Sequence, residues 1–156
     1  MNMIKRINIY DLDGTVIDSS HRYRAINGCI DLKYWRQNEH KCLHDGLLPL
    51  ASQFIDNINN PEVYVIIATS RVLCSNCYKF IRQNLGVPNH IISRRGNWDK
   101  RRAFDIKADG VNKHLFYKGL SLLPKYFYED NLETCQIVAA KVPNCKGIFV
   151  KSKQGH

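Results

Sequence analysis

The chain has 156 residues, of which 44% are hydrophobic and 24% are charged, and its 23 basic and 14 acidic side chains give a formal net charge of +9. The length predicts a single domain with one hydrophobic core, and the composition excludes collagen-like, coiled-coil and intrinsically disordered chains. The positive charge favours phosphate-bearing partners such as nucleotides or nucleic acid, although a solvated basic surface without a specific partner explains it at least as well.

No apolar run in the sequence approaches the roughly 20 residues that a membrane span requires, so no membrane partner is expected. The apolar stretch near the N-terminus is interrupted by Asp11 and Asp13, whereas a secretory signal needs an unbroken one. We therefore expect a cytoplasmic protein whose six cysteines are mostly reduced thiols.

Short apolar runs alternate with segments of helical periodicity, which predicts an α/β fold. The run 63–68 is nearly continuous and β-branched, as expected of a central parallel strand that is buried on both faces. The other expected strands are 4–10, 90–92, 126–128 and 147–150. Helices are expected over 50–58, over 75–85, from about Asp99 and over 115–123, with Gly110 separating the last two.

Residues 17–49 are polar and show no clear period, which indicates a small flap or cap inserted after the first strand. The whole chain, 1–156, is then a single domain. His21 and Arg22 lie early in this insertion; they could reach a bound substrate, but we favour a position at the surface.

Two acids follow the first expected strand in the segment Asp11-Leu12-Asp13-Gly14-Thr15-Val16. Ligands of open α/β sheets bind at the carboxyl ends of the strands, and Gly14 lets the backbone turn so that both carboxylates face one pocket. One carboxylate could then attack phosphorus while the other moves the proton of the leaving group. By local propensity alone, a simple polar turn is an equally good interpretation.

This segment resembles the DxDGT(V/L) signature of the haloacid dehalogenase superfamily of phosphohydrolases. The resemblance implies a Rossmann-like three-layer sandwich with a central, mostly parallel sheet. It also implies that Asp11 is the nucleophile and Asp13 the general acid and base. Gly14 and Thr15 would belong to the phosphate-binding loop.

A second motif of that superfamily, a Thr or Ser after the next core strand, is matched by Thr69-Ser70-Arg71. These residues are expected to bind phosphoryl oxygens through hydroxyl, amide and guanidinium groups. Thr69 could instead serve only as a cap for the helix that follows, and the two roles are compatible.

The resemblance further implies an acidic pair after a later strand, and Glu129-Asp130 occupies that place with Glu-Asp replacing the commoner Asp-Asp. It implies Mg²⁺ as the cofactor, held by Asp11, the backbone carbonyl of Asp13 and Asp130, with Glu129 behind them. Carboxylates together with phosphate and water are the ligands that Mg²⁺ prefers. A solvated turn is the other interpretation of the pair.

The superfamily also has a lysine that neutralises the nucleophile and the phosphate, and four lysines lie in range. Lys113 precedes Glu129 by 16 positions, which is tight for a helix, a turn and a strand, whereas Lys107 precedes it by 22. We predict Lys107 and keep Lys113 as the reserve.

The basic stretch from Arg94 to Arg102 precedes Lys107 and contains Trp98, and it resembles the 3′-phosphatase module of polynucleotide kinase-phosphatases. In this chain two extra residues separate Gly96 from Asp99. The stretch could follow a nucleic-acid backbone with Trp98 stacked on a base, or it could be a solvated turn anchored by a core tryptophan. The sequence has no GxxxxGK[ST] loop, so the kinase half has no counterpart.

These motifs together predict a Mg²⁺-dependent phosphomonoesterase that acts through an aspartyl-phosphate, on nucleotides or on the 3′-phosphate ends of nucleic acid. A phosphatase of small metabolites is the first alternative. A phosphotransferase, or a nucleic-acid-binding module on an inactive scaffold, is a further alternative.

Cysteines and histidines with metal-ligand spacing form one more candidate site. Zinc could be bound by some of Cys29, Cys42, Cys74 and Cys77 with His40 and His44. Cys77 also lies on an apolar helix face, where a reduced thiol packs as a small hydrophobe, and we favour that interpretation from sequence.

Overall fold

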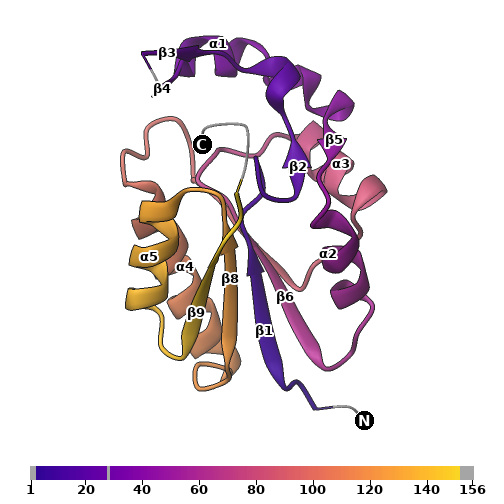
Figure 1. Cartoon of the computed structure of the whole chain (residues 1–156), viewed down its shortest axis with the longest axis vertical. Coiled ribbons are helices and arrows are strands. Elements are labelled where there is room, and N and C mark those ends of the chain that lie inside the picture. Colours follow the sequence, from indigo (N-terminus) through magenta and orange to yellow (C-terminus); the bar gives the residue numbers. More distant parts are fainter. Residues whose placement is uncertain (1–2, 28, 152–156) are drawn as a thin grey trace.

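The computed structural model describes residues 3–27 and 29–151, and its centre is a sheet of five parallel strands (Figure 1). The order across the sheet is β7-β6-β1-β8-β9. Tyr10 at the end of β1 pairs with Ile67 of β6 and with Tyr128 of β8. The carboxyl ends of these three central strands therefore meet at one edge. The strands are β1 (Arg6–Tyr10), β6 (Val63–Ala68), β7 (His90–Ile92), β8 (Lys125–Glu129) and β9 (Cys145–Phe149).

Helices cover both faces of this sheet. One layer holds α2 (Ala51–Ile58) and α3 (Ser75–Asn84), and the other holds α4 (Ala103–Lys118) and α5 (Leu132–Lys141) (Figure 1). Side chains alternate along a strand, so β1 sends Ile7 and Ile9 toward α4 and α5 but Tyr10 toward α2. The result is the three-layer α/β sandwich with a parallel sheet that the sequence predicted. No helix in the described ranges is long and apolar enough to cross a membrane.

The region after β7 differs from the sequence prediction of two helices separated by Gly110. A single helix, α4, runs through Gly110, begins at Ala103 rather than near Asp99, and ends where Gly119 adopts a left-handed φ of 71°. A Cβ atom on Gly110 would lie 2.5 Å from Cγ2 of Ile92 in β7. The glycine therefore permits close packing of helix on strand and does not break the helix.

Helix α5 was not predicted from the sequence, although its signals are present. Asn131 accepts a hydrogen bond from the backbone N–H of Thr134 at 2.9 Å, which is an N-cap. Cys135, Val138 and Val142 then follow at helical spacing and are buried. Because the first turn is polar and the apolar face is small, the helical periodicity of this segment is weak in the sequence.

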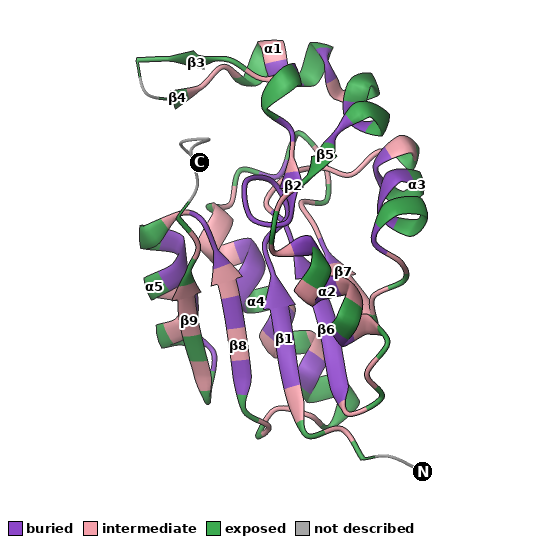
Figure 2. Cartoon of the chain, turned by 45° about the vertical axis from the view of Figure 1, so that its right-hand side comes forward, coloured by how far each residue is buried: buried purple, intermediate pink, exposed green. Residues whose placement is uncertain are grey.

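The segment predicted as a cap rises above the carboxyl edge of the sheet (Figures 1 and 2). Its stem is an antiparallel pair of short strands, β2 (Ile17–Asp18) and β5 (Gly46–Leu47). Between them lie η1 (Ser20–Arg22), the pair β3 (Ala25–Ile26) and β4 (Cys29–Ile30), α1 (Leu32–Gln37) and η2 (Glu39–His44). Figure 2 shows this cap mostly exposed on its outer side, in contrast to the largely buried strands β1 and β6 below it.

Candidate active site

Asp11 begins the loop that follows β1, directly at the meeting point of the central strands. Its backbone N–H donates to the carbonyl of Tyr128 at 2.9 Å, which extends the β1–β8 pairing to the acid itself. The chain then turns sharply at Gly14, whose φ is 81°, a conformation that glycine adopts without the steric penalty of a side chain. This turn lets Thr15 reach back, and its hydroxyl donates to Oδ2 of Asp11 at 2.9 Å.

Lys107 reaches the same point from the first half of α4. Its ammonium donates to Oδ1 of Asp11 at 2.7 Å and to Oε1 of Glu129 at 2.5 Å, and the side chain is almost fully buried. Lys113, the reserve, lies on the exposed side of α4. Of the two lysines weighed from the sequence, the structure brings Lys107 to the acids.

Glu129 and Asp130 end β8 beside β1 and complete an acidic cluster. Carboxylate oxygens of Asp11, Glu129 and Asp130 all lie within 4.8 Å of one another. The carboxylate of Glu129 accepts hydrogen bonds from Lys107 and from the backbone N–H groups of Asp130 and Asn131. Both carboxylate oxygens of Asp130, by contrast, are buried and accept no hydrogen bond from any residue in the ranges 3–27 and 29–151.

This arrangement fits a divalent cation. With all three carboxyl groups ionised, the cluster would exceed the single ammonium by two negative charges, and buried charges are stable only when they are paired or coordinate a metal. The free oxygens of Asp130 beside Asp11 are of the type that Mg²⁺ prefers. The carboxylate of Asp13 is not part of this group, and coordination through the backbone carbonyl of Asp13 stays a prediction.

The crowding shifts the pKa of each acid. Burial, together with the nearby charge of Asp11, raises the pKa of Asp130 to about 10 and that of Glu129 to about 7, although Lys107 opposes the second rise. Burial would also raise the pKa of Asp11, but the Lys107 ammonium and its hydrogen bond lower it to about 2. Asp11 is therefore the ionised member, as a nucleophile must be.

Asp13 faces two arginines instead of the acidic cluster. Nε of Arg71 lies 3.0 Å from Oδ2 of Asp13, and Nη2 of Arg22 lies 3.7 Å from Oδ1. Within the described residues, Nη1 of Arg71 is buried and donates no hydrogen bond. Its two N–H groups are spare donors suited to phosphoryl oxygens.

Thr69 and Ser70 follow β6, the neighbour of β1, as the sequence predicted. The backbone N–H of Thr69 donates to the carbonyl of Ile92 at 2.9 Å. The Oγ1 atom of Thr69 accepts from the N–H of Arg71 at 3.3 Å, which leaves the hydroxyl proton able to donate elsewhere. Both residues line the pocket that contains Asp11 and Asp13.

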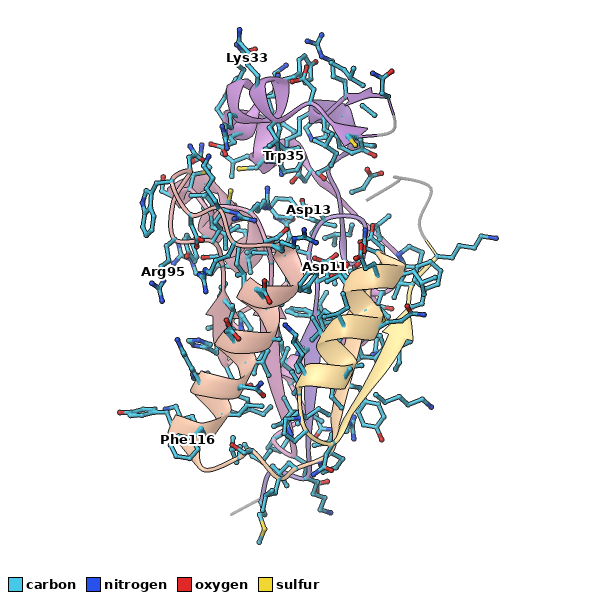
Figure 3. The ribbon with its side chains drawn as sticks, turned by 90° about the vertical axis from the view of Figure 1, so that its left-hand side faces the viewer. Asp11, Asp13, Lys33, Trp35, Arg95 and Phe116 are labelled. Atoms are coloured by element: carbon cyan, nitrogen blue, oxygen red, sulfur yellow. The ribbon has the colours of Figure 1, made fainter. Side chains whose placement is uncertain are left out.

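The pocket has a volume of about 460 Å³ and lies between the sheet edge and the cap. The cap contributes Ile30, Leu32 and Trp35 to its lining. Figure 3 shows Trp35 on the underside of the cap, above Asp13, whereas Lys33 points away from the pocket. The site thus has a charged floor and a partly apolar roof.

The loop between β7 and α4 forms one wall of this pocket. Arg94 is used inside the loop, since its guanidinium donates to the backbone carbonyls of Ser70, Asp99 and Arg101. Asp99 binds Arg101 and does not begin a helix. Trp98 is 71% exposed, which excludes the core-anchoring role that was one of its two sequence interpretations.

Sequence reasoning missed three residues of the cap that support the site. Arg22, expected at the surface, is fully buried, and its guanidinium makes a bidentate ion pair with Asp45 at 2.8 and 2.9 Å. Its Cζ atom also lies 4.4 Å from the ring centroid of Trp35. The burial of Arg22 depends on a partner 23 positions away, and no local signal in the sequence indicates that contact.

The structure brings some of the candidate zinc ligands together and places the others elsewhere. The sulfurs of Cys42, Cys74 and Cys77 converge at one place, and among the described residues neither histidine nor any other cysteine joins that group. Cys29 is exposed on the cap hairpin. Cys77 is buried on α3, as its place on the apolar helix face predicted.

Comparison with known proteins gives a family match. The family described as bacteriophage T5 5′-deoxynucleotidase matches residues 1–105. A curated relative, the 5′-deoxynucleotidase of Escherichia phage T5, is 33% identical over 86 residues, which cover 51% of this chain and 35% of that protein. The matched part therefore spans about a third of the relative's length.

Solved structures share the fold at low sequence identity. A haloacid dehalogenase-like hydrolase from Streptococcus pneumoniae has a TM-score of 0.64 at 13% identity, with 91% of this chain and 83% of that one covered. A chain of the Pnkp1/Rnl/Hen1 complex has a TM-score of 0.66 at 15% identity, covering 95% and 47%. A D,D-heptose 1,7-bisphosphate phosphatase from B. bronchiseptica, complexed with magnesium and phosphate, has a TM-score of 0.63 at 16% identity, covering 96% and 83%. The fold is that of haloacid dehalogenase-like hydrolases, and the chain belongs to the bacteriophage T5 5′-deoxynucleotidase family.

Proposed function

We propose that the chain is a Mg²⁺-dependent phosphomonoesterase that acts through an aspartyl-phosphate on nucleoside 5′-monophosphates, with deoxynucleotides as the leading substrates. The observation that carries this proposal is the carboxylate of Asp11, held by Lys107 beside oxygens of Asp130 that have no hydrogen-bond partner among the described residues, at the floor of a pocket. Uncatalysed hydrolysis of phosphate monoesters is among the slowest reactions known. Such a reaction needs a large rate acceleration, which a nucleophile, a cation site and spare guanidinium donors at one point can supply.

The chemical roles follow from these positions. An oxygen of Asp11 forms a bond to phosphorus as the bond to the leaving oxygen breaks, and Asp13 gives that oxygen a proton. A water then transfers a proton to Asp13 and attacks the aspartyl-phosphate, which regenerates Asp11 and releases phosphate. The spare donors of Arg71 and the hydroxyl of Thr69 would bind the phosphoryl oxygens. Mg²⁺ held by Asp11 and Asp130 would add positive charge opposite those oxygens.

Three observations support a mononucleotide. The pocket volume of about 460 Å³ is in the range of small-molecule sites. Its roof combines the exposed side chain of Leu32 with the edge of the largely buried Trp35, an apolar lining suited to a base. The relative that is 33% identical to this chain is a 5′-deoxynucleotidase.

We also propose a cytoplasmic location, because all six cysteines are free thiols.

A second candidate is hydrolysis of 3′-phosphate ends of nucleic acid. The specific observation in its favour is the exposed Trp98 in a basic loop, a combination that can stack on a base and follow a phosphate backbone. The wall of the pocket formed by this loop includes Lys100 and Arg101.

The proposal is tested by phosphate release from p-nitrophenyl phosphate with increasing Mg²⁺. Asp11→Asn and Asp13→Asn should each lose activity by at least about 10³-fold while remaining folded, since covalent and acid–base catalysis depend on them. Asp109→Asn, an exposed acid of α4, is the control and should retain activity. Activity of the Asp11 variant near that of the control, or activity unchanged by a chelator, would contradict the mechanism.

The substrate is tested with a panel of 5′-deoxynucleotides, 5′-ribonucleotides, 3′-phosphorylated oligonucleotides and sugar phosphates. We expect the highest kcat/KM for 5′-deoxynucleotides. Higher values for the oligonucleotides, with a strong decrease on adding salt, would favour the second candidate. Binding of oligonucleotide with no phosphate release from any compound would indicate an inactive scaffold.

A further inference from the structure

Three cysteine sulfurs from two separate parts of the chain meet on the side of the molecule where the cap joins α3. Cys42 belongs to η2 of the cap, and Cys74 and Cys77 belong to the N-terminal end of α3. The sulfur of Cys42 lies 3.9 Å from that of Cys74 and 3.7 Å from that of Cys77, and the last two sulfurs lie 3.0 Å apart. Cys42 and Cys77 are buried, and Cys74 is half-buried.

These distances match a metal site better than the alternatives. Tetrahedral zinc with Zn–S bonds of about 2.3 Å places its sulfurs about 3.8 Å apart, and two of the three separations lie within 0.1 Å of that value. The third is shorter, but it exceeds the roughly 2.05 Å of a disulfide by a wide margin. Packing of thiols as small hydrophobes requires only that each sulfur contacts carbon, so it does not explain why three sulfurs face one another.

The sequence order of the ligands is also typical of zinc sites. Cys74 and Cys77 form a C-x₂-C pair, with Cys74 as the N-cap of α3 and Cys77 within its first turn, so both sulfurs point to the same side. The distant Cys42 supplies the third ligand, as in structural zinc sites with three thiolates. Three thiolates around Zn²⁺ carry one net negative charge, and the guanidinium of Arg71 lies within electrostatic reach of Cys77.

We propose that Cys42, Cys74 and Cys77 bind one Zn²⁺ ion, which fastens the cap to the core beside the pocket. The fourth position is open to water, because no histidine nitrogen in the described ranges joins the three sulfurs. The site is separate from the proposed Mg²⁺ site, whose ligands are carboxylates, and it does not depend on the proposed function. Thiolates select zinc, whereas carboxylates suit magnesium.

The position of the site gives it a structural consequence. Cys42 lies three residues before Asp45, the partner of Arg22, and Cys74 lies three residues after Arg71. A metal bond between η2 and α3 would therefore hold two segments that place arginines beside Asp13. Removal of the metal should loosen the cap, with faster hydrogen exchange in residues 31–45 and little change in β1 and β6.

The test uses the full chain, purified without chelators, and two metals. Mass spectrometry of the metal content should give one zinc per chain. Cobalt titrated into the metal-free chain should produce a thiolate-to-cobalt charge-transfer band, which carboxylate ligands cannot give, and the visible bands of a tetrahedral ion. Cys42→Ser, Cys74→Ser and Cys77→Ser should each lose that band or reduce cobalt affinity by at least about 10-fold.

Cys29→Ser removes an exposed cysteine outside the cluster and is the matched control, which should bind like the wild type. Should Cys42→Ser fail to fold, Cys42→Ala, which keeps a small apolar side chain at this buried position, replaces it. A band that survives in the cluster variants, or the absence of any band in the wild type, would overturn the proposal. Loss of two thiols from the native chain without a reductant would identify a Cys74–Cys77 disulfide and would also overturn it.

Discussion

Replacement of Lys107 by methionine tests the electrostatic basis of the site. Methionine fills a similar volume but removes the charge that neutralises Asp11 and Glu129 at 2.7 and 2.5 Å. Removing one partner of a buried ion pair costs about 3–5 kcal/mol because the other partner remains buried and unpaired. At pH 8 we therefore expect the free energy of unfolding of the metal-free chain to fall by about 3–5 kcal/mol.

The loss should depend on pH in a defined direction. Burial raises the pKa of Glu129 to about 7, well above its value of 4.5 in an unfolded chain, and Lys107 opposes that rise. Without the lysine the folded state must hold protons that the unfolded chain has already released, so its stability decreases as pH rises from about 4.5 through 7 and beyond. At pH 5, close to the start of this range, only a small part of the decrease has accumulated, and the loss should be clearly smaller.

Urea unfolding at pH 5 and pH 8 measures this difference, and phosphate release measures the accompanying loss of activity. Lys113→Met is the control, because Lys113 lies exposed on the same helix and its substitution should change stability by less than about 0.5 kcal/mol. A Lys107→Met chain within about 1 kcal/mol of the wild type at pH 8, or a loss that is equal at both pH values, would refute the reasoning.

Three further predictions concern the cation, the helix and the cap. Mg²⁺ at about 100 times its Kd should stabilise the chain by about 2.7 kcal/mol, a rise in Tm of roughly 5–10 °C. At one fixed Mg²⁺ concentration the rise should be larger at pH 8 than at pH 5.5, because burial raises the pKa values of Glu129 and Asp130 and their protons must leave when the ion binds. Equal rises in thermal scans at the two pH values would contradict this. Gly110→Ala should lower stability by about 1–2 kcal/mol in urea unfolding, since contact with Ile92 outweighs the roughly 1 kcal/mol gained in helix propensity, and a more stable variant would show that the helix can shift. Arg22→Met should cost about 3–5 kcal/mol by leaving Asp45 buried and unpaired, and thermal unfolding near the wild-type Tm would mean that the ion pair is not needed.

The sequence was most informative where the chain is periodic or where one motif lies at the end of a strand. A nearly continuous β-branched run is typical of a buried parallel strand, and parallel strands bring their carboxyl ends together. Asp11 was placed at that edge by the end of its strand, whereas Thr69 and Asp130 were found through the resemblance to the haloacid dehalogenase motifs. The choice of Lys107 rested on the length of chain that a helix and a strand require.

Predictions from local sequence were wrong where a contact with a distant residue determines the helix or the burial of a side chain. Gly110 reads as a helix breaker because glycine disfavours helices, yet its missing side chain is what lets α4 approach Ile92. Arg22 reads as a surface residue, because arginine is rarely buried unless it is paired, and its partner Asp45 lies beyond two helices of the cap. Neither contact leaves a signal within the few residues that a periodicity window covers.

The acidic cluster shows why the same residues lower stability and support function. Without a cation, two of the three carboxyl groups have raised pKa values. At neutral pH the folded chain must either bury these charges or keep protons that the unfolded chain has released, and both lower its stability. A divalent ion removes this penalty, and the free energy recovered appears as affinity for the ion. A replacement of Asp130 by a neutral isostere should therefore stabilise the metal-free chain while it weakens Mg²⁺ binding. Such opposite effects are expected of a residue kept for its chemistry and not for folding.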